Sequence, residues 1–171
     1  MTPPRKFDLD RYLPYLINRA AVRFVGSIAP TLADCGVSLQ EWRVLAALRR
    51  VQRQRVSDLA EMTSIDISTL SRTLSAMQRR GLVERQRPAD GDARVVHVRA
   101  TEHGRTVTDR IAPAAQALET TALAGFTAAE AEALKDMLER IFGNIGSGLA
   151  PSAAGPERRD PAGLTGAEAA D

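Results

Sequence analysis

Residues 55–101 carry, in chain order, the signals of two short helices and a β-hairpin. Ser57 is a candidate N-cap for the first helix, and a polar turn separates that helix from the second. Gly81 follows the second helix and tolerates the left-handed backbone with which helices end. Two short runs, 82–87 and 94–99, then flank a turn rich in Pro, Gly and Asp, which predicts a hairpin. Helix, turn, helix and hairpin in this order predict a winged helix-turn-helix.

The second helix of this unit has an apolar face and an opposite face without acidic residues. Ile67, Leu70, Leu74 and Met77 repeat at helical spacing, so we expect them to pack on the body of the domain. The opposite face suits a polyanion, and Arg72 can donate two hydrogen bonds to guanine O6 and N7. The alternative is a solvated face on a helix of small residues. The DNA-binding residues predicted from the helix pair are Ser57, Ser68, Thr69, Arg72 and Arg79.

The predicted hairpin adds a second basic surface. Arg85 and Arg87 are two residues apart and therefore lie on one face of a strand. Asp92 precedes Arg94 by two residues, so its carboxylate can brace that guanidinium. An arginine at a hairpin tip suits the narrow minor groove of A·T-rich DNA. We predict that all four residues belong to the DNA-binding surface; alternatively, Asp92 and Arg94 form a turn clamp without DNA contact.

The basic residues are concentrated in the half of the chain that holds this unit. The net charge is only +2, yet residues 1–100 contain 17 Lys and Arg against 10 Asp and Glu. Residues 101–171 contain 6 against 11. Such an asymmetry is typical of nucleic-acid-binding proteins.

Several short motifs occur in the order found in one family of regulators. They are Leu39-Gln-Glu-Trp-Arg-Val-Leu-Ala-Ala-Leu48, Val56-Ser-Asp-Leu-Ala60, Ser68-Thr-Leu-Ser-Arg72, Arg80-Gly-Leu-Val-Glu-Arg85, Asp92-Ala-Arg94 and Ala100-Thr-Glu-His-Gly104. Over residues 8–149 the chain thus resembles the multiple-antibiotic-resistance regulator (MarR) family. Each motif alone is weak, whereas the ordered set is specific.

This resemblance implies a homodimeric bacterial repressor or activator whose DNA affinity changes when a small molecule binds. In that family the molecule is often a phenolic acid or its thioester. The resemblance also implies that Ser71 and Arg72 are the recognition-helix contacts and that Arg94 is the wing arginine. Ala100 departs from the family, which more often has leucine before the threonine.

Helical patterns are also expected on both sides of the winged helix. Residues 8–30 carry apolar residues at helical spacing, and Ser38 caps a second helix. Thr101 caps a long helix in which Pro113 is a candidate kink. Thr127 caps the last helix, with Glu130 completing a capping box. The apolar stripes are Leu13, Leu16, Ile17, Ala20, Phe24 and Ile28 in the first helix and Leu134, Leu138, Ile141, Ile145 and Leu149 in the last.

We therefore predict a mainly α fold with a small β-wing, in which a winged helix-turn-helix head is carried by a helical dimerisation region. The N-terminal dimerisation helix occupies 1–37, the DNA-binding domain 38–100, the C-terminal dimerisation helices 101–149 and a disordered tail 150–171. A head this small cannot cover both terminal stripes, which predicts a homodimer on a palindromic operator, with heads roughly 34–36 Å apart. The alternative is an intrachain helical bundle in a monomer.

The first helix also offers residues that could bind a small aromatic or acyl effector. Tyr15 and Arg19 are four residues apart and share a helix face, with Tyr12 and Arg23 nearby. A ligand ring could stack on the tyrosine while the guanidinium pairs with a carboxylate or phosphate. The alternative is that Arg19 forms a surface ion pair and Tyr15 fills the dimer interface.

Catalytic interpretations find little support in the sequence. The two histidines lack the spacing of a zinc pair, and no Gly-rich phosphate loop follows a strand. We predict no enzyme, metal or cofactor, and Cys35, the single cysteine, is expected to pack, with thiol-based sensing as the alternative. No signal peptide or membrane-length apolar run is found, which predicts a cytoplasmic protein without a membrane partner. The rival function is a winged-helix interaction module of an enzyme or complex that does not read DNA.

Overall fold

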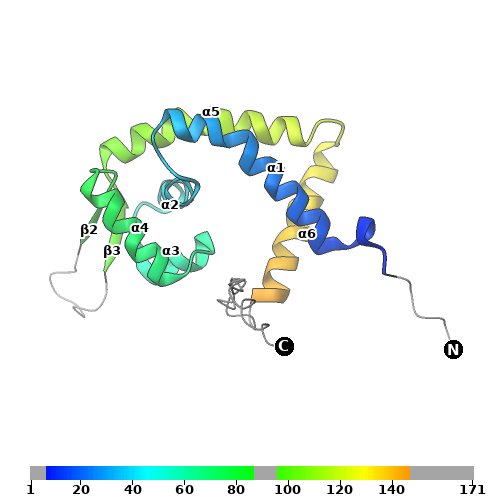
Figure 1. Cartoon of the computed structure of the whole chain (residues 1–171), viewed down its shortest axis with the longest axis horizontal. Helices are drawn as coiled ribbons and strands as arrows, with labels where there is room; N and C mark the ends of the chain where they lie inside the picture. The colour runs from blue at the N-terminus through cyan, green and yellow to red at the C-terminus, as the bar shows by residue number, and fades with distance from the viewer. Residues whose placement is uncertain (1–6, 87–95, 147–171) are drawn as a thin grey trace, which may run out of the picture. The chain divides into compact units, whose positions relative to one another are not determined.

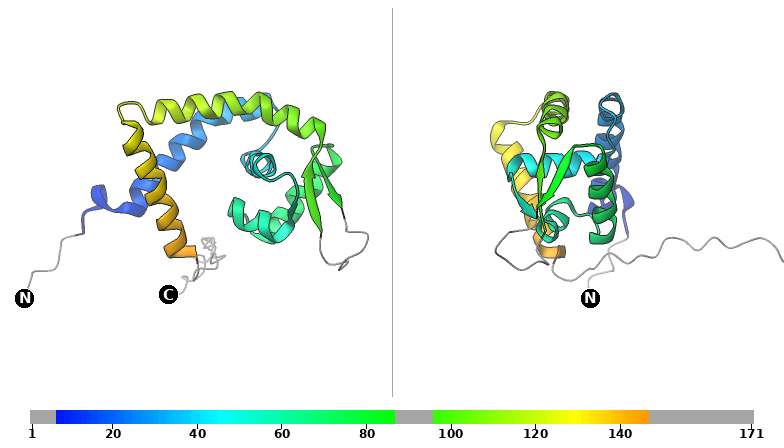
Figure 2. Two further views of the ribbon diagram at one scale, coloured as in Figure 1. Left: turned by 180° about the vertical axis from the view of Figure 1, so that it is seen from behind. Right: turned by 90° about the vertical axis from the view of Figure 1, so that its left-hand side faces the viewer.

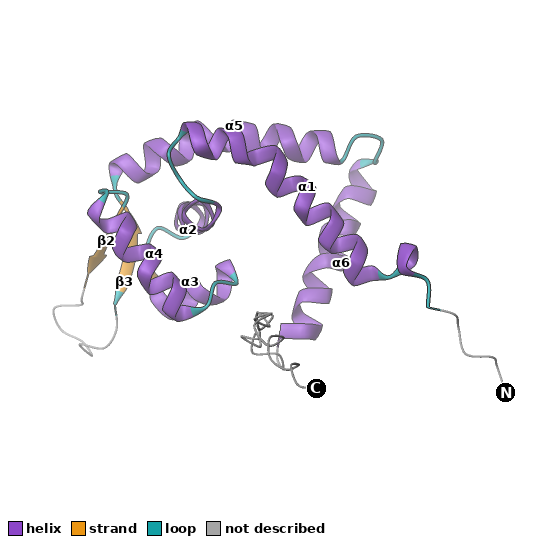
Figure 3. Ribbon diagram, in the orientation of Figure 1, coloured by secondary structure: helices purple, strands orange, loops and turns teal. Residues whose placement is uncertain are grey.

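The computed structural model describes residues 7–86 and 96–146, which form helices and a small three-stranded sheet (Figures 1 and 3). The predicted fold class, mainly α with a β-wing, is confirmed. Residues up to Thr127 belong to one compact unit and residues from Ala128 to a second. The elements are the 3-10 turn η1 (Leu9–Arg11), α1 (Leu13–Asp34), α2 (Leu39–Arg50), β1 (Gln54–Arg55), α3 (Val56–Thr63), α4 (Ile67–Arg79), β2 (Val83–Gln86), β3 (His97–Ala100), α5 (Glu102–Ala122) and α6 (Ala128–Gly146).

Helix α2 lies at the centre of the first unit. It contacts α1, α3, α4, α5 and β3. Figure 2 shows α1 and α5 side by side, with α2, α3, α4 and the sheet below them. The winged helix, from α2 to β3, therefore packs against two long helices, α1 before it and α5 after it in the chain.

The sheet contains one strand more than the sequence predicts. Its order is β1-β3-β2, both pairs are antiparallel, and Glu84 lies opposite Arg99 in the register. The additional strand, β1, spans only Gln54–Arg55 and has no alternating apolar pattern. Its position depends on the buried side chain of Gln54, whose Nε2 donates to the Ala47 carbonyl oxygen at 2.9 Å.

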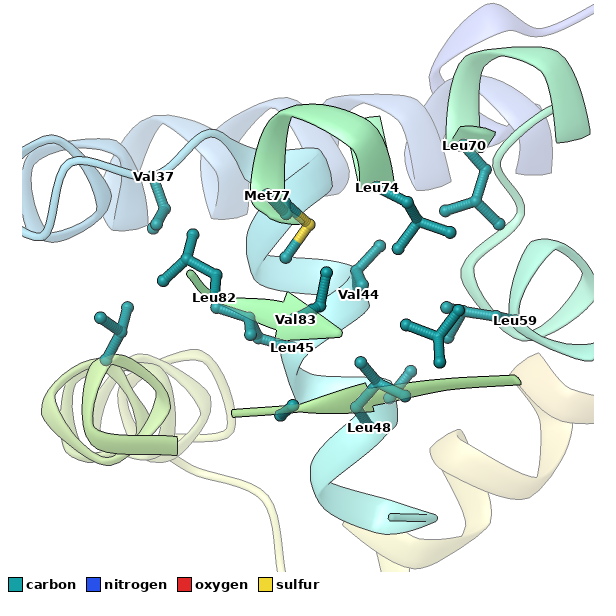
Figure 4. Packing of buried hydrophobic residues seen from close by; sticks show 14 of the residues in the cluster. Val37, Val44, Leu45, Leu48, Leu59, Leu70, Leu74, Met77, Leu82 and Val83 are labelled. Atoms are coloured by element: carbon teal, nitrogen blue, oxygen red, sulfur yellow. The ribbon is translucent and has the colours of Figure 1, made fainter. Parts of the chain in front are cut away.

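The core of the head forms where α4 packs on α2 and on the start of the hairpin (Figure 4). Leu70, Leu74 and Met77 are fully buried, as predicted, and burial of such side chains is a main favourable term in folding. The prediction for Ile67 is wrong, because this first residue of α4 is 56% exposed. Leu70, Leu74 and Met77 share this core with residues of α2 and of the hairpin, namely Val44, Leu45, Leu48, Leu82 and Val83.

The helix ends confirm most of the predicted caps. Ser38 and Glu41 form a capping box at the start of α2, and Thr101 Oγ1 accepts the Gly104 amide at 3.0 Å at the start of α5. Gly81 has φ +68, as a left-handed helix end requires. The predicted Ser57 cap is wrong: α3 begins at Val56, because the preceding residues are held extended in β1. Ser57 Oγ instead donates to Asp58 Oδ1 at 2.9 Å.

The predicted apolar stripes of the terminal helices are largely exposed in a single chain. In α1 only Ile28 of the predicted stripe is buried, while Phe24 is 43% exposed. In α6, Leu138 and Ile145 are 44% and 53% exposed, and Phe142 reaches 59%. The predicted Thr127 cap and its capping box stay predictions.

Two further predictions concern residues outside the described ones. They are Leu149, at the end of the last stripe, and the disordered tail over 150–171. Pro113 lies inside α5, which is continuous from Glu102 to Ala122. None of the helices described here is long and apolar enough to span a membrane.

Candidate nucleic-acid interface

The face of α4 that points away from α2 has the composition predicted for DNA contact. Ser68, Arg72 and Arg79 are exposed, and Thr69 is partly buried. No residue from Ile67 to Arg79 is acidic. Arg72 Nη2 lies 3.5 Å from Ser68 Oγ, one helical turn earlier, so the two predicted contact residues meet on this face.

Asp66 caps this helix and orders its first turn. Its Oδ1 accepts the backbone amides of Ser68 at 2.9 Å and Thr69 at 3.2 Å, and also the Ser68 hydroxyl. The hydrogen bond from the Ser68 side chain, followed by those from the two amides, holds the pKa of Asp66 below its usual value. A charged carboxylate therefore holds the two hydroxyl residues at the start of the recognition helix.

This lowered pKa predicts that the free energy of unfolding decreases in acid. The folded-state pKa of Asp66 lies below its unfolded value, so the cap stabilises the fold above the unfolded value. That contribution is lost as the pH falls below about 4 and through the folded-state pKa. We expect urea unfolding of the native chain between pH 5 and pH 3 to include this loss. Asp66→Asn, which keeps an N-cap oxygen but cannot titrate, should show a shallower pH dependence; identical profiles would contradict the cap's role.

Arg85 donates hydrogen bonds to α4, a contact that the alternation of residues along the strand did not predict. Its Nη2 donates to the Ser71 carbonyl oxygen at 2.8 Å and to Ser75 Oγ at 3.2 Å. Its Nε is buried and has no hydrogen-bond partner within the described part of the chain. The side chain therefore braces the recognition helix against β2, and the predicted DNA contact of Arg85 stays a prediction.

A cavity of about 430 Å³ opens beside this brace, between the first turn of α3, α4 and the strands. It brings together the hydroxyls of Ser57 and Ser71, two predicted contact residues that are far apart in sequence, and the guanidinium of Arg85. Ile67 also lines it, which accounts for that side chain's exposure. Hydroxyls and guanidinium groups at a helix start are groups that bind DNA phosphates. Arg55 also lines this cavity; sequence analysis did not select it.

The tip of the predicted wing lies outside the described residues. Arg87, Asp92 and Arg94 all fall in 87–95, so their roles stay predictions. At the base of the hairpin, Arg99 Nε and Glu84 Oε1 form an ion pair at 2.5 Å across the β2–β3 register. That pair links the two strands through their side chains as well as through the backbone.

The residues predicted to bind an effector lie near the start of α1. The guanidinium of Arg19 stacks over the Tyr15 ring at 5.5 Å, so these two side chains are neighbours, as predicted. Tyr12 packs its ring against Phe7, with centroids 5.1 Å apart, and Arg23 is exposed. One face of the Tyr15 ring is thus covered by the Arg19 guanidinium, and the ligand contact predicted for these residues stays a prediction.

A second cavity, of about 400 Å³, lies between α1, α2 and α5, starting further along α1. Its walls are mostly apolar, with the rings of Phe24 and Trp42 among them. The charged side chains in its lining are Arg43 and Glu119. Sequence analysis missed this site because its walls come from three different helices. The remaining lining residues are Ala21, Val25, Ile28, Leu39, Ala115 and Leu118.

A metal-binding cluster and a reactive cysteine are the other kinds of site to consider in the described part of the chain. No group of three or more His, Cys, Asp and Glu side chains there could hold a metal ion. Cys35, at the end of α1, is half-buried and packs against the core. That placement is the packing role expected for it.

Comparisons with known proteins agree on one family. Residues 36–95 match the family model described as MarR family. The chain is 28% identical over 140 residues to the HTH-type transcriptional repressor IacR of Pseudomonas putida, covering 82% of this chain and 83% of that protein.

Two solved structures extend this similarity to the fold. A MarR family transcriptional regulator from Silicibacter pomeroyi has a TM-score of 0.75 and 31% identity, covering 82% of this chain and 97% of its own. BpsR of Bordetella bronchiseptica, whose DNA binding is regulated by 6-hydroxynicotinic acid, has a TM-score of 0.66 and 26% identity, covering 75% and 97%.

Proposed function

Because the chain belongs to the MarR family of transcriptional regulators, we propose that it represses transcription by binding a palindromic operator as a homodimer. We further propose that a small aromatic or acyl ligand lowers its affinity for DNA. The observation that supports DNA binding is the exposed face of α4, which has no acidic residue. Asp66 caps this helix, and Arg85 braces it against β2.

In this proposal α4 enters the major groove of the operator. Arg72 reads a base edge, and Ser68 and Thr69 contact bases or phosphates near the start of the helix. Ser57 and Ser71, at the cavity between α3 and α4, hold a phosphate of the same half-site. Arg79, at the C-terminal end of α4, contacts the sugar-phosphate backbone of the DNA. Arg94, braced by Asp92, enters the adjacent minor groove.

The homodimer is supported by the apolar side chains that a single chain leaves exposed. Leu13 of α1 is 48% exposed, and Phe142 of α6 is 59% exposed. Clusters of exposed apolar side chains mark interaction sites in soluble proteins. A two-fold dimer would present two copies of α4 to successive major grooves, roughly 34–36 Å apart.

The effector is proposed to bind in the cavity between α1, α2 and α5. An aromatic ring would pack between Phe24 and Trp42, and its carboxylate would pair with the Arg43 guanidinium. Tyr12, Tyr15, Arg19 and Arg23 form the alternative site. Release of DNA requires a ligand that binds the DNA-free conformation more tightly, so tight binding alone is insufficient.

Paired arginine variants test this assignment. An operator is first selected from random duplexes with the full chain, and aromatic carboxylates, 6-hydroxynicotinic acid among them, and coenzyme A thioesters are then screened by calorimetry. For a ligand that releases the operator, Arg43→Ala should weaken binding about tenfold or more, because a charge-assisted hydrogen bond is lost. Arg19→Ala is the matched control and should leave the ligand affinity unchanged. The reverse pattern would move the site to the start of α1, and a releasing ligand insensitive to both variants would contradict both sites.

A further inference from the structure

A single arginine at the end of the recognition helix joins three helices. Arg80 occupies the C-cap position of α4. Its Nη1 donates to Glu41 Oε1, in the first turn of α2, at 2.7 Å, and its Nη2 donates to the carbonyl oxygen of Gly36. Gly36 belongs to the turn that ends α1, where its own amide bonds the Ala33 carbonyl oxygen at 2.9 Å. The end of α1, the start of α2 and the end of α4 therefore meet at one guanidinium.

The carboxylate at this junction is almost fully enclosed. The Glu41 side chain is 10% exposed, and its other oxygen, Oε2, accepts the Ser38 backbone amide at 2.8 Å. The Ser38 hydroxyl in turn accepts the Glu41 amide at 3.2 Å. A buried carboxylate is costly to leave unpaired, so Glu41 and Arg80 are expected to move together.

The proposed effector cavity has walls on the same turn of α2. Leu39 and Trp42, which line the cavity, flank Glu41 in the first turn of that helix. The Trp42 amide bonds the Ser38 carbonyl oxygen at 2.9 Å, so the cavity wall and the capping box share one backbone turn. Ile28, on the α1 wall, lies on the helix whose final turn leads to Gly36.

We infer that Arg80 is a positioning residue that transmits occupancy of this cavity to the recognition helix. An occupant that shifts α1 or the first turn of α2 displaces Gly36 or Glu41. The guanidinium follows its partners and moves the C-terminal end of α4, and with it the spacing of the DNA contacts. This inference rests on the proposed function, because it takes the cavity as the effector site.

The test uses substitutions that fill the cavity in place of a ligand. Ala115→Phe on α5 fills it from one wall, and Ala21→Phe on α1 provides an independent filler from another. Each is combined with Glu41→Gln and Arg80→Met in the full chain. Glutamine also completes a capping box, so the pair of substitutions removes the ion pair while keeping the α2 cap. Arg49→Met is the control, because it removes an α2–α5 ion pair, with Asp109, that does not involve α4.

Operator affinity is measured by fluorescence anisotropy on the selected duplex and on random DNA. In the otherwise native chain the fillers should lower operator affinity about tenfold, within the usual range of allosteric coupling. With Glu41→Gln and Arg80→Met present, the same fillers should change it less than about twofold, whereas the Arg49→Met background should retain the full effect. Equal filler effects in all backgrounds would overturn the role of Arg80 and leave the effector cavity standing. Fillers without effect in the native chain would overturn the cavity and, with it, the relay.

Hydrogen exchange supplies a readout that is independent of DNA. The Arg80 and Gly81 amides bond the Ala76 and Gln78 carbonyl oxygens at 3.2 and 3.0 Å. Fillers should speed their exchange in the native chain, with little change at the Val51 amide at the opposite end of α2. If Glu41→Gln with Arg80→Met lowers helicity and binding to all DNA equally, the test is repeated with Glu41→Gln alone, and filler effects equal to those in the native chain then overturn the inference.

Discussion

Gly104→Ala is expected to lower the free energy of unfolding by about 2–3 kcal/mol, at the upper end for substitutions that overpack a core. A Cβ at this position would overlap the Leu82 carbonyl oxygen and lie 3.3 Å from Leu45 Cδ2. The oxygen is backbone and cannot move aside, since it also accepts the Thr101 amide at 3.1 Å. The first turn of α5 would have to lift from the hairpin. Urea unfolding at fixed protein concentration measures the effect.

Gly26→Ala provides the matched control for this substitution. Gly26 lies within α1, and a Cβ there meets nothing within 4 Å. Alanine is the better helix former, so this variant should be neutral or more stable by up to about 1 kcal/mol. Equal stability of Gly104→Ala and the native chain would show that α5 does not depend on this close approach.

Arg72→Ala is expected to weaken operator binding by about 1–3 kcal/mol, or roughly 5- to 150-fold. Its guanidinium lies on the exposed, acid-free face of α4 beside Ser68, where it can reach a base edge. Loss of a base contact should also relax sequence preference at one position of each half-site. Anisotropy titrations with the selected operator, single-base variants of it and random duplexes measure both effects.

The same titrations distinguish base reading from phosphate contact. If Arg72→Ala weakens binding to operator and random DNA equally and reduces the salt dependence, Arg72 contacts phosphate. Arg110→Ala is the control: it removes an exposed arginine of α5, a helix that supplies none of the proposed DNA contacts, and should change neither affinity. A native chain whose retention on DNA does not fall with salt would contradict the DNA-binding interpretation itself.

The local features of the head follow directly from the sequence. The buried face of α4, the caps at Ser38 and Thr101 and the helix end at Gly81 all depend on residues within one or two turns. Periodicity and capping chemistry are properties of short segments, so they can be read without knowing what packs where. The acid-free composition of α4 is local in the same sense.

The features that sequence analysis missed depend on contacts between residues far apart in the chain. The Ser57 cap failed because β1 pairs with β3, more than forty residues away, and holds the preceding residues extended. Strand parity selected Arg85 but did not predict that its guanidinium bonds Ser71 and Ser75 on α4. Ile67 matches the helical period but lies beside the cavity between α3 and α4 instead of the core.

By itself, the sequence determined the order of the helices and of the hairpin, most of the buried face of the recognition helix and the resemblance to the MarR family. Only the tertiary structure decided which side chains support that helix and where a ligand-sized cavity lies. The junction of Gly36, Glu41 and Arg80 spans 44 residues between its first and last members. The cavity walls come from α1, α2 and α5. Such contacts depend on how separate helices pack, and no local propensity specifies which distant residues will meet.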